Sequence, residues 1–197
     1  MEPKVVEPTA PAPLPPVRGP TPARVAPPPA PAAEPFEIAL QPVRIELGER
    51  EIHIELELLI GNRTDSTAEA IRLSAAVVSA SPRQDMDIAG FQAASQLAPS
   101  APPFDLPPGG AGRMPMRLSL ARELVHVVEL GGRPMFVPIV AVDLRWRGGL
   151  SIRRFGMSFM IGTAGQSGRP GPIWLNRGQP RGPLTATRYV AKAPGAS

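Results

Sequence analysis

The stretch Glu51–Thr64, with the sequence EIHIELELLIGNRT, constrains the fold of this chain more than any other. Aliphatic residues occupy every second position from Ile52 to Ile60, and histidine or glutamate stands at most of the positions between them. Side chains alternate between the two faces of a β-strand, so the pattern predicts a strand with one buried face and one solvated face. The rest of the chain must supply the apolar surface against which this strand packs.

The segment before this stretch predicts a strand that pairs with it. Residues 36–47 hold two alternating apolar runs, and the phase shifts at Gln41-Pro42. Proline cannot donate to a β-ladder, so we expect a bulge or a sheet edge there. The residues at 48–50 then predict a tight turn, so that the two strands form a β-hairpin.

Further strands and one helix follow. Residues 68–79 and 113–120 alternate and predict strands, and Pro115 favours a sheet edge for the second of them. A shorter strand is expected over 124–130. Ser81-Pro82 resembles a helix N-cap followed by proline at the first helical position, so we expect a short helix over about 82–95.

The most apolar run, residues 135–146, predicts a central strand, with Pro138 at its start or at a bulge. Gly148-Gly149 predicts a hairpin turn. The returning segment, residues 150–161, changes its apolar phase part of the way along, which predicts a bulge near Arg153-Arg154.

These segments amount to about seven strands with one short helix. The fold class we expect is all-β, an immunoglobulin-like antiparallel β-sandwich. A parallel α/β fold would need crossover helices, and the pattern does not provide them.

Composition divides the chain into three parts. Of its 28 prolines, 13 lie in the first 35 residues, so we expect a disordered Pro/Ala-rich linker over 1–35. The β-sandwich domain should cover 36–162, and a Gly/Pro-rich basic tail should cover 163–197. The sequence contains no run of 18 apolar residues and no secretory signal, so we expect a soluble chain as given, with membrane association only if an anchor lies upstream.

Little in the sequence indicates catalysis. The absence of cysteine excludes disulfides, thiolate nucleophiles and cysteine metal sites. His53 and His126 are the only histidines, and neither stands in a metal-ligand or triad spacing. Glu55 and Glu57 share a strand rather than facing each other across a cleft, and no phosphate-binding or nucleophile motif occurs. We therefore predict no enzyme activity and no cofactor.

Basic residues gather toward the end of the chain. From 145 to 197 there are nine basic residues and no acidic one. An arginine-rich hairpin could pair with the glutamates of the Glu51 strand, or it could bind an external anion, because a guanidinium matches carboxylate and phosphate oxygens. Nucleic acid is the less favoured partner because few aromatic residues accompany these arginines. The candidate contact residues are Arg145, Arg147, Arg153, Arg154, Trp174 and Arg177.

Three segments carry a resemblance to a known group of proteins. FEIALQPVRIELGEREIHIELELLIGN, GGRPMFVPIVAVDLRWRGGLSIRRFG and GTAGQSGRPGPIWLNRG resemble a group of uncharacterised alphaproteobacterial proteins, mainly of sphingomonad type, over about residues 36–180. In that group the domain follows a proline-rich linker and often a membrane helix. The group has no established activity, so the resemblance implies no functional residues.

The function we expect is that of a non-catalytic structural or protein-interaction module of bacterial type, held on a Pro-rich spacer. The sequence does not identify its protein partner. The alternative is a protein that binds an anionic surface, either membrane or nucleic acid, through the Arg145–Arg154 hairpin and the basic tail.

Overall fold

The alternating stretch forms β2, the middle strand of a three-stranded antiparallel sheet in the order β1-β2-β5. The computed structural model describes residues 34–165 and 169–191. The linker expected over 1–35 lies, up to residue 33, outside the described residues, as does the end of the expected tail, 192–197. The elements are β1 (Phe36–Leu47), β2 (Glu51–Asn62), β3 (Ala68–Ser79), α1 (Gln84–Ala93), β4 (Phe104–Leu106), β5 (Ala111–Ala121), the 3-10 helix η1 (Arg122–Leu124), β6 (Val128–Leu130), β7 (Arg133–Phe136), β8 (Pro138–Gly148), β9 (Ser151–Ala164), β10 (Pro170–Gly171), β11 (Ile173–Trp174) and β12 (Leu184–Tyr189).

The predicted hairpin of β1 and β2 is confirmed. The five alternating aliphatic residues of β2 are at most 2% exposed, and their partners in β1 and β5 are apolar residues, except that Ile60 pairs with Gly112 of β5. The register shifts between Pro42 and Arg44, which confirms the bulge. Val43, at the bulge, is 61% exposed. It belongs to the second alternating run, with Ile45 and Leu47, but it does not share the buried face of Ile45.

A second antiparallel sheet has the order β10-β9-β8-β3-β4, and β12 also pairs with β9. The central strand predicted within residues 135–146 is confirmed as β8, and Val140, Val142, Leu144 and Trp146 on its inward face are at most 4% exposed. The Trp146 ring meets the Phe36 ring of the first sheet edge to face, with 4.8 Å between centroids. The inner faces of the two sheets thus share one hydrophobic core.

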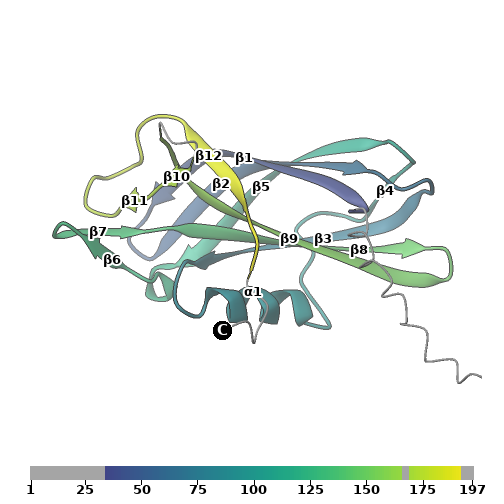
Figure 1. Cartoon of the computed structure of the whole chain (residues 1–197), viewed down its shortest axis with the longest axis horizontal. Helices are drawn as coiled ribbons and strands as arrows, with labels where there is room; N and C mark the ends of the chain where they lie inside the picture. The colour runs from purple at the N-terminus through teal and green to yellow at the C-terminus, as the bar shows by residue number, and fades with distance from the viewer. Residues whose placement is uncertain (1–33, 166–168, 192–197) are drawn as a thin grey trace, which may run out of the picture. The chain divides into compact units, whose positions relative to one another are not determined.

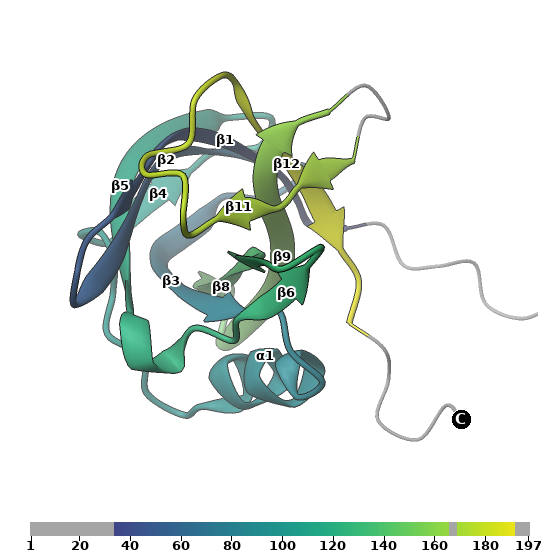
Figure 2. The same ribbon diagram turned by 90° about the vertical axis from the view of Figure 1, so that its left-hand side faces the viewer.

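The predicted antiparallel β-sandwich is confirmed for the described residues. The two sheets lie face to face, and α1 covers the outer face of the second sheet (Figure 1). Seen from the end, β12 lies next to β1, so that the two sheets approach each other along that edge (Figure 2). More strand segments are present than expected because several short pairings extend the sheets.

The bulge expected near Arg153-Arg154 is wrong. β8 and β9 pair in an unbroken register from Ile139↔Met160 to Gly148↔Ser151. The phase change has another cause: at the hairpin tip, Leu150 and Ile152 are 110% and 73% exposed, so they never join the buried face.

The apolar run at 135–146 does not form one strand. It divides at Val137 into β7 and β8, with Pro138 at the start of β8 as one of the two expected alternatives. β7 turns back onto β6 through Gly131 and Gly132, which both have positive φ, a conformation that glycine adopts without steric cost. β6, β7 and β11 form a small third sheet in the order β11-β7-β6.

The segment expected as a tail from residue 163 contributes strands to these sheets. β10 and β12 both pair with β9, and β11 pairs with β7. At Gly162 the chains approach so closely that a Cβ atom would lie 1.9 Å from the Gly171 carbonyl oxygen. Glycine is therefore required at position 162, where β10 pairs with β9.

The predicted helix is present but shorter than expected. It begins at Gln84 with Arg83 at the N-cap and no side-chain capping bond, so the N-cap expected at Ser81 is wrong. Ser81 lies in the turn before the helix: its hydroxyl accepts a hydrogen bond from the Arg83 backbone amide at 3.1 Å, and its own backbone amide donates to the Gln84 side chain at 3.0 Å. Ile88 is buried against Ile139 and Ala141, which holds the helix on the second sheet.

Candidate functional site

The Arg145–Arg154 hairpin is the first of three surface features with functional potential. The side chain of Asp143 of β8 is only 1% exposed and lies between two arginines of this hairpin. It accepts a hydrogen bond from Arg145 Nε at 2.7 Å and another from Arg154 Nε at 2.6 Å. A buried carboxylate requires such partners, so these two arginines neutralise a charge within the domain.

Arg145 also holds the end of helix α1. Its terminal nitrogens donate to the carbonyl oxygens of Ala94 and Ser95, the latter at 2.6 Å. These carbonyls follow the last helical residue and have no partner within the helix, and a cation there also favours the helix dipole. Arg145 therefore connects the sheet, the buried Asp143 carboxylate and the C-terminal end of the helix.

The predicted arginine cluster is thus only partly available to an external anion. Arg147 faces Glu69 at 3.9 Å, and both side chains are more than half exposed. Arg153 lies over Gly148 at the hairpin tip and has no ion-pair partner among the described residues. The alternative pairing with glutamates of β2 is wrong, because those glutamates pair with arginines of β1 and β5 instead.

The histidines lie apart from each other and from any cluster of ligands. His53 Nε2 lies 3.7 Å from the Glu51 carboxylate on the outer face of β2. The described residues contain no group of three or more His, Cys, Asp or Glu side chains that could hold a metal ion. His126 is exposed, and its backbone amide, rather than its imidazole, donates to Ser79 Oγ at 2.9 Å. This bond fastens the segment after η1 to the end of β3.

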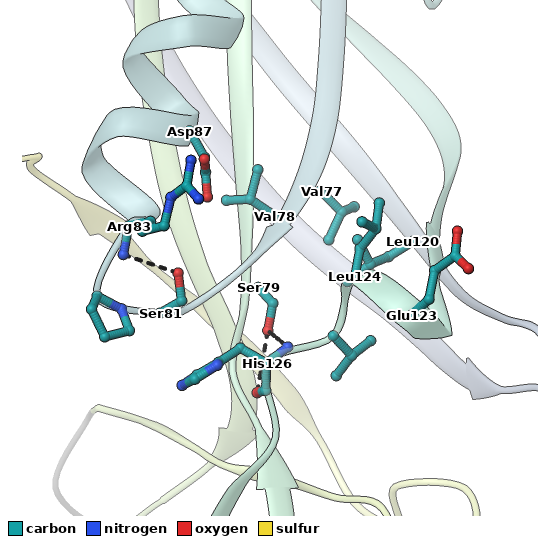
Figure 3. A pocket seen from close by; sticks show the side chains of 12 residues that line it. Val77, Val78, Ser79, Ser81, Arg83, Asp87, Leu120, Glu123, Leu124 and His126 are labelled. Atoms are coloured by element: carbon teal, nitrogen blue, oxygen red, sulfur yellow. Dashed lines mark hydrogen bonds between the residues drawn. The ribbon is translucent and has the colours of Figure 1, made fainter.

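The second feature is an apolar groove of about 760 Å³ between the start of α1 and η1 (Figure 3). Val77, Val78, Leu120 and Leu124 project between the helix and η1, and Asp87 and Glu123 lie at its margins. The Ser79–His126 hydrogen bonds lie at its lower end. This groove was not predictable from the sequence, because it forms where segments distant in the sequence meet.

Exposed aliphatic residues continue from the groove along η1 and β6. We call them the η1–β6 strip: Leu124, Val127, Val128 and Leu130, which are 66%, 47%, 41% and 55% exposed. β6 is the edge of the small sheet and pairs only with β7 among the described strands. The short strand predicted over 124–130 is present only as β6, over Val128–Leu130, because the chain forms η1 up to Leu124.

The third feature is a pocket of about 550 Å³ beside Trp174, on the opposite edge of the small sheet. The loop after β11 encloses it with Arg177, Gln179 and Arg181. Two guanidinium groups lie near the Trp174 ring: that of Arg133 at 4.7 Å and that of Arg177 at 5.6 Å from its centroid. Trp174 and Arg177 were predicted contact residues and are brought together here; Arg133 and Arg181 were not predicted. The hairpin arginines do not line this pocket.

The end of β12 is fastened to helix α1 by a polar contact. The Tyr189 hydroxyl donates to the Asp85 carboxylate at 2.5 Å and accepts from Nε2 of the Gln84 side chain at 2.6 Å. Burial and the hydrogen bond to Asp85 raise the pKa of Tyr189 above its ordinary value. One residue before Tyr189 on β12, Arg188 donates a hydrogen bond to Glu34, and this bond lowers the pKa of the Glu34 carboxyl group.

Comparisons with known proteins do not assign a family to this chain. No protein-family profile, curated protein or solved structure matches the chain. Within the described residues, no helix has the length and apolar character needed to cross a lipid bilayer.

Proposed function

We propose that this chain is a non-catalytic protein-interaction module whose contact surface is the η1–β6 strip. The observation that carries this proposal is the exposure of four neighbouring aliphatic side chains, each at least 41% exposed, on and beside a sheet edge. Contiguous exposed apolar surface on a folded domain marks a site of interaction, whereas isolated exposed aliphatic residues are ordinary.

The partner we propose is a protein segment in extended conformation that adds a strand to β6. An edge strand presents unpaired backbone donors and acceptors, which a partner strand can satisfy. Strand addition supplies affinity through the main chain, and aliphatic residues at alternate positions of the partner would contact Val128 and Leu130. The groove beside Leu124 would take the next apolar side chain along.

A Pro-rich spacer fits this role. The tract over 1–35 is rich in proline, and such tracts extend rather than collapse, so it would hold the module at a distance from whatever it is attached to. The resemblance to the alphaproteobacterial group supports a bacterial origin, and membrane tethering would require an anchor upstream. The alternative of binding an anionic surface has less support, because Arg145 and Arg154 already bind Asp143.

The proposal is tested by selecting peptides from a displayed library with the full chain. Enriched peptides are then synthesised, and their affinities are measured by calorimetry against the wild type and the double variant Val128→Asp/Leu130→Asp. We expect peptides with aliphatic residues at alternate positions, and a loss of affinity of at least about tenfold in the variant, because two carboxylates would be desolvated at the contact.

The matched control is Leu150→Asp/Ile152→Asp, which introduces the same charges at exposed aliphatic positions of another hairpin. It should bind the selected peptides as the wild type does. If no such peptides are enriched, or if both double variants bind equally well, the η1–β6 strip is not the contact surface.

A further inference from the structure

The pocket beside Trp174 is built on fixed backbone. Ile173 is completely buried, and the Leu175 amide donates to the Pro134 carbonyl at 3.0 Å. The Gln179 side chain accepts from the Leu47 amide at 3.0 Å, and the Pro183 carbonyl accepts from the Ala164 amide at 2.9 Å. The loop is therefore tied to β7, β1 and β9, so the side chains that line the pocket are held on a positioned backbone.

The charge of this pocket is not balanced by the domain. Eight other arginines of the described part have carboxylate partners within 4.0 Å: Arg44, Arg63, Arg113, Arg117, Arg145, Arg147, Arg154 and Arg188. Arg177 and Arg181 are among the arginines of that part that have none, and no acidic residue lines the pocket. Two guanidinium groups on one concave surface attract an anion, because their repulsion is relieved when it binds.

We infer that this pocket binds a small organic molecule with a phosphate or carboxylate group attached to a flat apolar body. The two guanidinium groups provide planar donors that match an oxyanion, and the half-buried Trp174 ring provides a flat wall. The volume of about 550 Å³ exceeds the needs of a bare inorganic ion and is typical of sites for small organic ligands. This site is separate from the η1–β6 strip, and the inference does not depend on the proposed function.

Calorimetric titration of the full chain with phenyl phosphate, benzoate and inorganic phosphate tests the inference. Saturable binding of phenyl phosphate or benzoate should weaken by at least about tenfold in Arg177→Gln/Arg181→Gln. Trp174→Leu should weaken the aromatic ligands and leave inorganic phosphate unchanged, because the bare ion does not need the flat wall. The circular dichroism spectrum and the thermal unfolding of Arg177→Gln/Arg181→Gln should match those of the wild type, since both arginines are exposed.

The matched control is Arg50→Gln/Arg122→Gln, which removes the same charge from exposed or half-exposed arginines at the β1–β2 turn and η1. It should bind every probe as the wild type does. If the two double variants lose affinity for the probes equally, the effect comes from the overall charge of the chain, and the proposed site is wrong. Absence of saturable binding, or arginine-dependent retention on anionic lipid vesicles without binding of the small probes, would also overturn it.

Discussion

Replacement of Asp143 by asparagine should destabilise the domain and loosen helix α1. The Asp143 carboxylate is 1% exposed, and each of its oxygens accepts from a different arginine. Asparagine has nearly the same size but places an NH₂ group opposite one guanidinium donor, so that one of the two hydrogen bonds becomes a donor–donor contact. The two positive charges then lose the anion that holds them together.

The magnitude follows from the burial of the three groups. Removing one partner of a fully buried ion pair costs about 3–5 kcal/mol. Here the side chains of Arg145 and Arg154 are 20% and 38% exposed, so water solvates part of each guanidinium. We therefore expect Asp143→Asn to lower the free energy of unfolding by about 2 kcal/mol, which is a decrease of about 4–8 °C in Tm for a domain of this size.

Urea denaturation followed by circular dichroism measures this change as a lower midpoint with an unchanged m value. Hydrogen exchange gives a second readout, because Arg145 binds the carbonyl groups at the end of α1, and the amides of 84–93 should lose more protection than those of β2. The control is Glu55→Gln on the exposed face of β2, which should change the free energy by less than about 0.5 kcal/mol. An Asp143→Asn variant as stable as this control would refute the reasoning.

Three further perturbations have defined outcomes. Leu56→Asp should abolish cooperative unfolding in calorimetry, because an aspartate at a position 2% exposed costs about as much as the whole stability of a domain. Burial and the hydrogen bond to Asp85 raise the pKa of Tyr189 in the folded state, so the unfolded chain loses the hydroxyl proton at a lower pH than the folded chain does. The free energy of unfolding should therefore fall as the pH rises above 10.0, and Tyr189→Phe should reduce that fall. The hydrogen bond from Arg188 lowers the pKa of Glu34, so the folded state binds this proton less tightly; stability should decrease as the pH falls below 4.5, and Glu34→Gln should reduce the decrease measured in urea titrations.

The sequence predicts the sandwich well where burial alone decides the pattern. One face of β2 is wholly buried, so its period of two is visible in the aliphatic residues themselves. The inward face of β8 is visible for the same reason. The bulge in β1 was also predictable, because proline at position 42 interrupts the alternation at the residue where the register shifts.

The outer faces were harder to predict because their contacts depend on tertiary pairing. Leu150 and Ile152 suggested a bulge only under the assumption that aliphatic residues must be inside, and they are exposed. The arginines of the hairpin looked available because the carbonyl groups at the end of helix α1, which Arg145 binds, come from another part of the chain. A usable signal did exist: an aspartate at position 143, inside the most apolar run, must be paired if it is buried, and Arg145 was the nearest cation in sequence.

The small sheet β11-β7-β6 combines two surface properties that the fold does not require. On the outer face of the first sheet, by contrast, Glu46, Glu55 and Glu57 all meet arginines. In the small sheet, Phe136 and Ile173 supply the core, and the remaining side chains are not needed for it. One edge nevertheless exposes aliphatic residues, and the other carries unmatched arginines around a tryptophan. Both features would be neutral or unfavourable for an isolated domain, since apolar surface and like charges gain by meeting a partner. Because burial of the sandwich core explains neither, we propose binding as the physical role that accounts for both.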